Sequence, residues 1–129
     1  MAFGRDTTAE HIKPLEGAIV RRYTAGATIA AGEIVAIMAD GYVDPANTAA
    51  FTGSVVLGIA LNAASSGDRV DAVVFGPVEC LTDGTPANLV YASDTAGEPS
   101  ESVGTKDILV GITESSTVLF VRPEFIDRS

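Results

Sequence analysis

Few residues in this chain could carry nucleophilic catalysis. A Ser-His-Asp or Cys-His arrangement needs an imidazole within hydrogen-bond reach of the nucleophile, and His11 is the only histidine among 129 residues. It lies in a polar N-terminal segment, and the chain contains no Gly-x-Ser-x-Gly sequence. Cys80 lies within an apolar run, where we expect a buried and unreactive thiol. The sequence therefore argues against a serine or cysteine hydrolase.

Metal ligands are also too few for the common metal sites. Structural zinc sites use several Cys and His side chains, and this chain has one of each. Calcium needs only oxygen ligands, which Asp40, Asp44 and Asp83 could donate from predicted turns. The segment from Asp40 to Asp44 lacks the spacing of an EF-hand loop, and aspartate is a common turn residue. We therefore expect no metal and interpret these aspartates as turn formers.

Phosphate-binding and sugar-cleaving patterns are missing from the sequence as well. Neither Gly-x-x-x-x-Gly-Lys nor Gly-x-Gly-x-x-Gly occurs. A glycosidase needs two carboxylates facing each other across a cleft. The carboxylates in strand-like runs are better interpreted as residues of solvent-exposed sheet faces: Glu33, Asp71 and Glu79. The sequence thus predicts a protein with no enzymatic activity and no cofactor.

The composition indicates one folded domain with an acidic surface. Of its residues, 47% are hydrophobic but only 6% are aromatic, so Val, Ile, Leu and Ala must fill the core. The net charge of −9 disfavours binding to a nucleic-acid backbone. No apolar run is long enough to cross a bilayer, and a single cysteine cannot form an intramolecular disulfide. We expect neither nucleic acid nor a membrane as a partner.

Short β-branched runs separated by turn residues make up most of the chain. Residues 1–17 are polar and lack an apolar period, which predicts an extended N-terminal arm. Residues 46–51 indicate a single turn or a loop, and residues 93–106 an exposed loop. Residues 18–129 are predicted to form an all-β domain, a single small β-barrel or sandwich of about eight or nine short strands. The expected strands are 18–23, 33–38, 42–43, 53–61, 69–75, 78–81, 88–92, 108–112 and 117–121.

A similar order of segments occurs twice along the chain. Residues 31–35 are followed by 56–59 and 70–73, and residues 86–90 are followed at comparable distances by 109–112 and 118–121. Two such β units packed together would make one closed or nearly closed barrel. Any valine-rich β protein also produces such matches by chance, so the sequence leaves both interpretations open.

Five segments between Tyr23 and Val121 follow one another in a recognisable order. They are Gly32-Glu33-Ile34-Val35, Leu57-Gly58-Ile59-Ala60, Gly67-Asp68-Arg69-Val70-Asp71-Ala72-Val73-Val74, Val90-Tyr91 and Val110-Gly111-Ile112. This order resembles the small all-β capsid decoration (cement) proteins of tailed bacteriophages over about three-quarters of the chain. Each segment is also common in β-barrels, so the resemblance depends on their order and spacing.

The resemblance implies a structural virion protein that binds the outer surface of the assembled capsid and stabilises it. Such proteins bind the major capsid protein at local three-fold positions of the head, often as trimers. The resemblance also implies synthesis in the host cytoplasm and a final location on the outer capsid surface. The N-terminal arm and the long loop at 93–106 depart from the family's pattern, and both bear on how this chain attaches.

Basic side chains are concentrated near the N-terminus. Five of the nine basic or potentially basic residues lie there: Arg5, His11, Lys13, Arg21 and Arg22. Opposite charge favours docking of one protein on another. We therefore hypothesise that these residues contact an acidic capsid surface or an adjacent decoration subunit.

Two other functions compete with this interpretation. The chain could be another virion component, such as a head-fibre base or a small β module of a tail. It could instead be a β-barrel that binds a carbohydrate or another small molecule. The latter predicts a deep pocket lined by convergent polar groups, whereas a decoration protein predicts an exposed apolar patch at a subunit interface.

Overall fold

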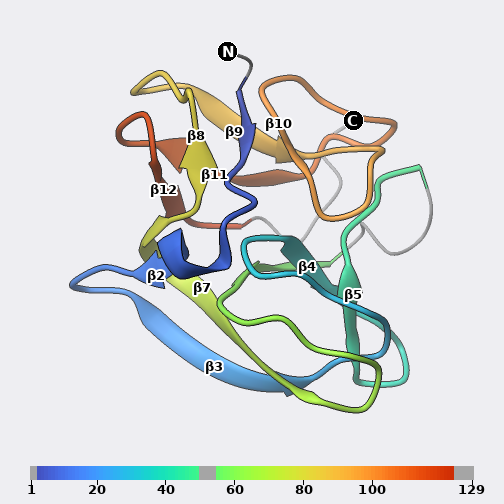
Figure 1. Cartoon of the computed structure of the whole chain (residues 1–129). Coiled ribbons are helices and arrows are strands. Elements are labelled where there is room, and N and C mark those ends of the chain that lie inside the picture. The colour runs from blue at the N-terminus through green and yellow to red at the C-terminus, as the bar shows by residue number, and fades with distance from the viewer. Residues whose placement is uncertain (1–2, 50–54, 124–129) are drawn as a thin grey trace.

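The computed structural model describes residues 3–49 and 55–123, and this part of the chain is almost entirely β (Figure 1). The predicted all-β class is confirmed, because the described residues contain no α-helix and form a strongly curled antiparallel sheet. Some residues of the predicted segments lie outside the described residues: 1–2 of the N-terminal arm, 50–51 of the turn at 46–51, 53–54 of the strand at 53–61, and 50–54 and 124–129 of the domain.

Twelve strands and one short 3-10 helix (η1) are present in the described residues. Eight of the strands have three or more residues, close to the predicted number, and four have only two. The elements are β1 Gly4–Arg5, η1 Ala9–His11, β2 Lys13–Pro14, β3 Ile19–Thr24, β4 Ile34–Ile37, β5 Val43–Pro45, β6 Val56–Ala60, β7 Arg69–Glu79, β8 Leu81–Thr82, β9 Leu89–Ala92, β10 Pro99–Ser100, β11 Leu109–Thr113 and β12 Val118–Val121.

The eleven-residue strand β7 joins the two halves of the sheet. Its N-terminal part pairs with β3 and β6, and its C-terminal part pairs with β2 and β12. The main sheet runs in the order β10-β9-β11-β12-β7-β6-β4-β5. Ala25, directly after β3, forms a bridge with Val43 of β5, so the sheet around β7, β6, β4 and β5 curls back on itself.

The repeated segments form two β units with the same register, as the weak sequence similarity suggested. The first unit consists of β4, β6 and the N-terminal part of β7, and the second of β9, β11 and β12. In the first unit, Ile34, Val35 and Ala36 pair with Ile59, Gly58 and Val56, across a register shift. In the second unit, Leu89, Val90 and Tyr91 pair with Ile112, Gly111 and Leu109, with the same shift. The chain is thus a structural duplication.

A glycine at the same place in each unit permits a close approach of two strands. A Cβ added to Gly58 of β6 would overlap the carbonyl oxygen of Val73 in β7. A Cβ added to Gly111 of β11 would overlap the carbonyl oxygen of Phe120 in β12. Glycine is therefore required at both positions, because only a residue without a side chain fits there.

The two units pack on each other to form the main core. Residues from one face of the first unit, including Ile34, Ile59 and Val73, belong to one buried cluster with residues from one face of the second unit, including Val90 and Leu119. A second cluster lies on the opposite face of the first unit. It joins Val35, Ala60 and Ala72 of that unit to residues that follow β3 or lie on β5, such as Ile29 and Val43. Both faces of the first unit are therefore covered.

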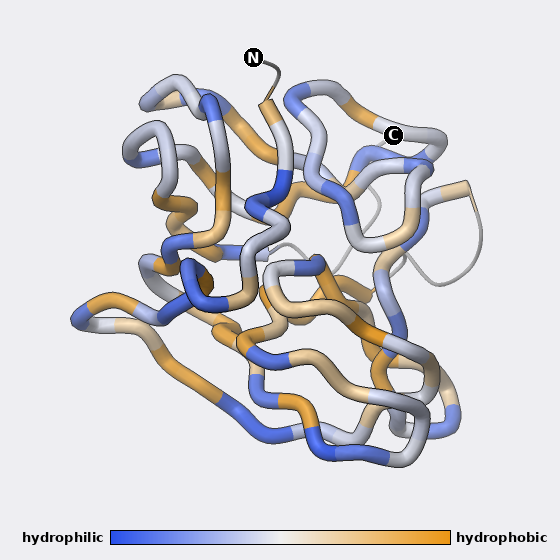
Figure 2. Tube along the Cα trace, viewed as in Figure 1, coloured by the Kyte–Doolittle hydropathy of each residue, from blue (hydrophilic) through white to orange (hydrophobic). Residues whose placement is uncertain are grey.

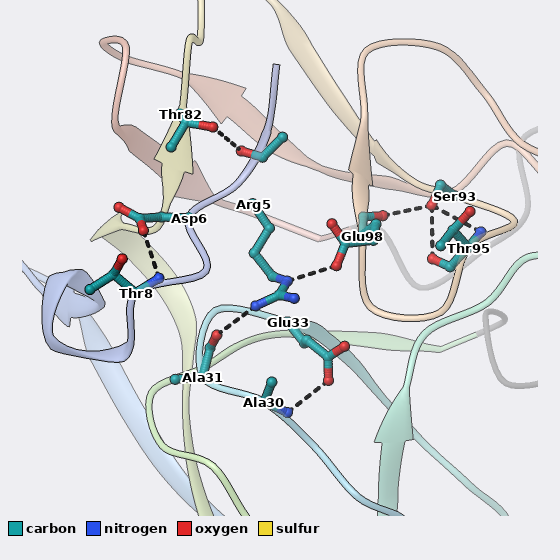
Figure 3. A network of polar contacts seen from close by, with 11 residues as sticks. Arg5, Asp6, Thr8, Ala30, Ala31, Glu33, Thr82, Ser93, Thr95 and Glu98 are labelled. Atoms are coloured by element: carbon teal, nitrogen blue, oxygen red, sulfur yellow. Dashed lines mark hydrogen bonds and ion pairs between the residues drawn. The ribbon is translucent and has the colours of Figure 1, made fainter. Parts of the chain in front are cut away.

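The N-terminal segment is extended and lies along the domain in its described part. Strand β1 pairs with β8, and β2 pairs with the end of β7. Ile12 is buried in the main core, and the Arg5 side chain reaches between Glu98 and the carbonyl oxygen of Ala31 (Figure 3). The apolar side chains of Phe3 and Ile12, the two short strand pairings and the contacts of Arg5 hold the segment against the barrel.

Candidate interaction surface

The structure places the five predicted basic residues in separate settings, where three of them form ion pairs and His11 forms a hydrogen bond within the chain. The Nε atom of Arg5 lies 2.7 Å from Glu98 Oε2, and the Arg5 side chain is only 14% exposed. Lys13 pairs with Glu79 at 3.5 Å, and Arg22 with Asp71 at 3.7 Å. His11 Nδ1 lies 2.8 Å from Asp6 Oδ2.

Arg21 and Arg22 are the basic residues best placed to contact another protein. Both lie on β3, which pairs only with β7 among the described strands, so its other edge carries no strand. Figure 2 shows that this strand changes from hydrophobic at its start to hydrophilic further along. No ion pair of Arg21 is found among the described residues. Arg5, by contrast, is turned toward the interior of the domain.

A polar depression of about 460 Å³ lies between the N-terminal segment and the end of β7. Its lining residues are Asp6, Glu10, His11, Lys13, Glu79 and Thr117. The pKa of Asp6 is lowered, first by a hydrogen bond from the backbone N–H of Thr8 and then by His11. Glu79 accepts a hydrogen bond from Thr117 and pairs with Lys13. Asp6 and Glu79 thus already have partners within the chain, and Glu10 is the one lining carboxylate for which the described residues provide none.

The surroundings of the residues considered for catalysis and metal binding do not favour either role. The Cys80 thiol is buried in the main core, and this burial raises its pKa, so the thiol stays protonated and inert. Within residues 3–49 and 55–123, no group of three or more His, Cys, Asp or Glu side chains could hold a metal ion. The same residues include no helix long and apolar enough to cross a membrane.

Two of the three aspartates that could have bound calcium lie at turns, and the third, Asp44, lies within strand β5, where it pairs with Ala36 of β4. Asp40 accepts a hydrogen bond from the backbone N–H of Tyr42, two residues further along the hairpin between β4 and β5. The pKa of Asp44 is raised because the carboxyl is partly desolvated and Asp40 lies nearby. Asp83 adopts a φ of 56°, in the left-handed region where aspartate is tolerated. The interpretation as turn formers thus holds for Asp40 and Asp83 and is wrong for Asp44, which is a strand residue.

The strongest candidate for a binding surface is an apolar face of the second unit. We call this the outer face and define it by Leu89, Leu109, Ile112 and Phe120, which come from β9, β11 and β12. Leu89 is 44% exposed and Ile112 is 38% exposed, large values for side chains of this size within a sheet. Together with Gly111 and Arg122 these four residues line a groove of about 190 Å³. A liquid water molecule occupies roughly 30 Å³, so the groove has room for an apolar side chain of a partner.

The outer face continues across neighbouring strands. The Phe75 ring of β7 meets the Phe120 ring edge to face, with 5.2 Å between the ring centroids. Phe75 is paired in register with Ile19 of β3, and both residues are exposed. Four of the seven exposed large hydrophobic residues in the described chain lie on this row: Ile19, Phe75, Leu89 and Ile112. Such clustering is typical of a protein-interaction site and not of singly scattered surface residues.

Sequence reasoning did not identify this surface. It expected an apolar patch in general terms but assigned the candidate residues by charge, near the N-terminus. A signal was available in residues 109–112, since Leu, Val, Gly and Ile in succession leave no polar side chain for a solvent-exposed face. A strand with apolar residues on both faces needs a partner on both faces, and the structure supplies only one.

Comparisons with known proteins do not extend this description, since no family model and no curated protein matches the chain.

Proposed function

We propose that this chain is a structural virion protein that binds the outer surface of an assembled phage capsid and stabilises it, acting as a homo-oligomer, which the resemblance suggests is a trimer. The observation that carries the proposal is the continuous apolar row from Ile19 to Leu89 on the outside of a closely packed β domain. A row of this kind is suited to binding proteins. The kind of partner, the major capsid protein, is inferred from the resemblance of the motif order to decoration proteins.

The duplicated β units fit a stabilising role. In each unit a glycine allows two strand backbones to come into direct contact, and each unit contributes one face to the shared core. A domain packed in this way binds with little loss of conformational entropy. A protein that binds only the assembled lattice stabilises it by mass action, by about 2.7 kcal/mol per site at a concentration of 100 times the Kd.

Contact with the capsid is assigned in this proposal to β3 and its two arginines. Arg21 and Arg22 lie on the free-edged strand of a protein with a net charge of −9. They would attract an acidic capsid surface and repel a basic one, so attachment should weaken as the salt concentration rises. Arg5 is left out of this contact, because its side chain is only 14% exposed and already pairs with Glu98.

The test is sedimentation of the full-length protein with undecorated phage heads. We expect the protein to sediment with the heads at saturable stoichiometry and to raise the temperature at which they release DNA. Electron microscopy of the decorated particles should place it on the outer capsid surface. Density on a tail or at a fibre base would assign it to another virion component, and no density on any part of the particle would refute a virion role.

Charge reversal tests the role assigned to β3. The single variant Arg21→Glu, which changes the net charge by the same amount as Lys106→Glu, should reduce the occupancy of heads severalfold at low salt. Lys106→Glu, on the loop after β10 and away from β3 in Figure 1, is the matched control and should leave occupancy within twofold. Equal loss in both variants would show that net charge, and not the β3 surface, governs attachment. A truncation of residues 1–17 is a poor test, because it removes Ile12 from the core.

A further inference from the structure

Strand β3 lies at the rim of the molecule, and its edge away from β7 carries no strand among those described (Figure 1). The backbone N–H of Ala25, directly after β3, donates to the carbonyl oxygen of Asp68 in the same register as the pairs between β3 and β7. Successive residues of an antiparallel strand point alternately to its two sides. Val20 and Arg22 therefore direct their backbone groups toward the free edge of β3.

The internal duplication identifies the equivalent edge in the second half of the molecule. Strand β3 runs antiparallel beside β7 in the first half, as the end of β7 runs antiparallel beside β12 in the second. The shared register matches three residues of β3 with three of β7: Val20 with Pro77, Arg21 with Val78 and Arg22 with Glu79. The end of β7 thus shows what the edge of β3 can accept.

The equivalent edge of β7 is covered by a short extended segment. Strand β2 pairs with it in antiparallel register, which sets Lys13 opposite Glu79. Further along, the backbone N–H of Leu15 donates to the carbonyl oxygen of Pro77. Pro77 and Glu79 thus direct backbone groups toward the added segment, as their counterparts in β3 do toward the free edge. An antiparallel extended segment is therefore the occupant that the duplication indicates for β3.

The charges along β3 indicate an acidic residue in that segment. In the second half, Glu79 lies 3.5 Å from Lys13 across the strand pair. Its counterpart Arg22 carries the opposite charge, and Arg22 shares its one partner, Asp71, with Arg69. Two positive charges and one negative charge leave a surplus of +1 at this place. A carboxylate directly opposite Arg22 would balance the surplus, because opposite charges favour a cross-strand pair.

An apolar residue belongs two positions further along the added segment. Leu15 has this place in the second half, opposite the counterpart of Val20. Val20 is 45% exposed, so its side chain offers an uncovered apolar surface. A segment with an acidic residue, any residue and an apolar residue in succession would pair with both Arg22 and Val20. A second copy of β3 would instead set arginine against arginine.

We propose that the free edge of β3 binds an extended segment of the major capsid protein by strand addition, with an acidic residue opposite Arg22 and an apolar residue opposite Val20. Strand addition gains affinity from main-chain hydrogen bonds and specificity from alternate side chains. The proposal rests on the proposed function and deepens it, because it states how β3 meets its partner. Its first experiment needs no capsid, so its failure and the failure of capsid binding can be told apart.

The first experiment uses two synthetic peptides of residues 10–17, one with the native sequence and one carrying Lys13→Glu. Binding to the full-length protein is followed by NMR titration through the amide signals of Val20 and Arg22. The Lys13→Glu peptide should bind at least fivefold more tightly than the native-sequence peptide, because it sets a carboxylate opposite Arg22. An Arg22→Glu protein should reverse this preference, and an Arg22→Gln protein should abolish it.

Lys106→Glu is the matched control for these variants, because it changes the net charge as Arg22→Glu does. It should leave the preference between the two peptides within twofold of that of the native protein. Absence of binding of the Lys13→Glu peptide at millimolar concentration would overturn the proposal. An equal change of preference in the Arg22→Glu and Lys106→Glu proteins would also overturn it.

The second experiment measures amide hydrogen exchange of the full-length protein, free and bound to undecorated heads. The N–H groups of Val20 and Arg22 should exchange at least tenfold more slowly on the heads, whereas that of Val103, an exposed residue away from β3, should not change. Protein that sediments with the heads without this protection would overturn strand addition and leave capsid binding intact. Protection already present in the free protein and lost in an Ile126→Ser chain would assign the edge to the chain's own C-terminal segment, which would also overturn the proposal.

Discussion

The two β units share a register and a glycine-locked crossing, yet their surroundings differ. The first unit is buried on both faces, by the second unit on one side and by residues around Ile29 and Val43 on the other. The second unit is buried on one face only, and Leu89 and Ile112 of its other face meet solvent. The comparison teaches that one local pattern serves two purposes. It builds a core where another layer is present, and it presents an apolar surface where the layers end.

The largest effects are expected at the two glycines. Gly58→Ala and Gly111→Ala should each destabilise the fold by about 3 kcal/mol or more, because the new Cβ overlaps a backbone oxygen that cannot move without breaking the ladder. Gly58→Ala should be the worse of the two, since the first unit is enclosed on both faces. Urea unfolding measures both. Gly4→Ala, with open space around its Cβ, is the control and should change stability by less than about 0.5 kcal/mol.

The next effect compares equivalent isoleucines. Ile59→Ala should cost about 2–5 kcal/mol, because it leaves a cavity in the main core. Ile112→Ala should cost less than about 1 kcal/mol in dilute solution, since its side chain already contacts water. Urea unfolding at low protein concentration measures both losses. Similar losses in the free energy of unfolding would mean that the two faces are equally covered, which would contradict the difference between the units.

A smaller effect is expected where the units differ in backbone chemistry. Gly32 precedes β4 with a φ of +89°, and at the matching place before β9 Ala87 has a φ of +72°. Ala87→Gly should stabilise the fold by up to about 1 kcal/mol, because an L-residue is disfavoured in this conformation. Gly32→Ala should destabilise it by about 1–2 kcal/mol, since the Cβ would also lie 3.0 Å from Ile12 Cδ1. Thermal unfolding of the two variants should therefore shift in opposite directions.

The smallest effect is a pH dependence at a contact between the halves. Asp94, in the loop after β9, accepts hydrogen bonds from Thr105 and from Thr48, which follows β5, and these bonds lower its pKa below the ordinary 3.8. A lowered carboxyl pKa adds stability above the unfolded value, and that stability is lost as the pH falls from about 4 through the folded pKa. Asp94→Asn should therefore show a shallower loss of stability below pH 4 in acid titrations. An unchanged acid profile would show that Asp94 contributes little to the contact.

The fold could be predicted from the sequence because its signals are local. Runs of Val and Ile between turn dipeptides located most strands, and Asp40-Gly41 correctly indicated the hairpin between β4 and β5. The repeated order of segments suggested the duplication, which the matching registers then established. These features depend on backbone preference and two-residue alternation, which a single sequence displays.

The candidate surface could not be predicted in the same way, because exposure depends on what lies on the far side of a strand. Ile59 and Ile112 follow a glycine in nearly identical segments, yet one is buried and the other is not. The contacts of the basic residues could not be predicted for a related reason. Arg5 and Lys13 pair with carboxylates distant in sequence, Glu98 and Glu79, and a single sequence does not display such pairs. Docking through the basic residues near the N-terminus stays a prediction.

Strand β7 belongs to both halves, and this has a mechanical consequence. Because one uninterrupted segment is hydrogen-bonded to β6 in the first unit and to β12 in the second, neither half can detach while that segment remains intact. Tension applied at one half is transmitted along the strand as shear across many bonds together, instead of opening them one after another. A domain in which one strand joins both halves should therefore unfold under force in a single abrupt event.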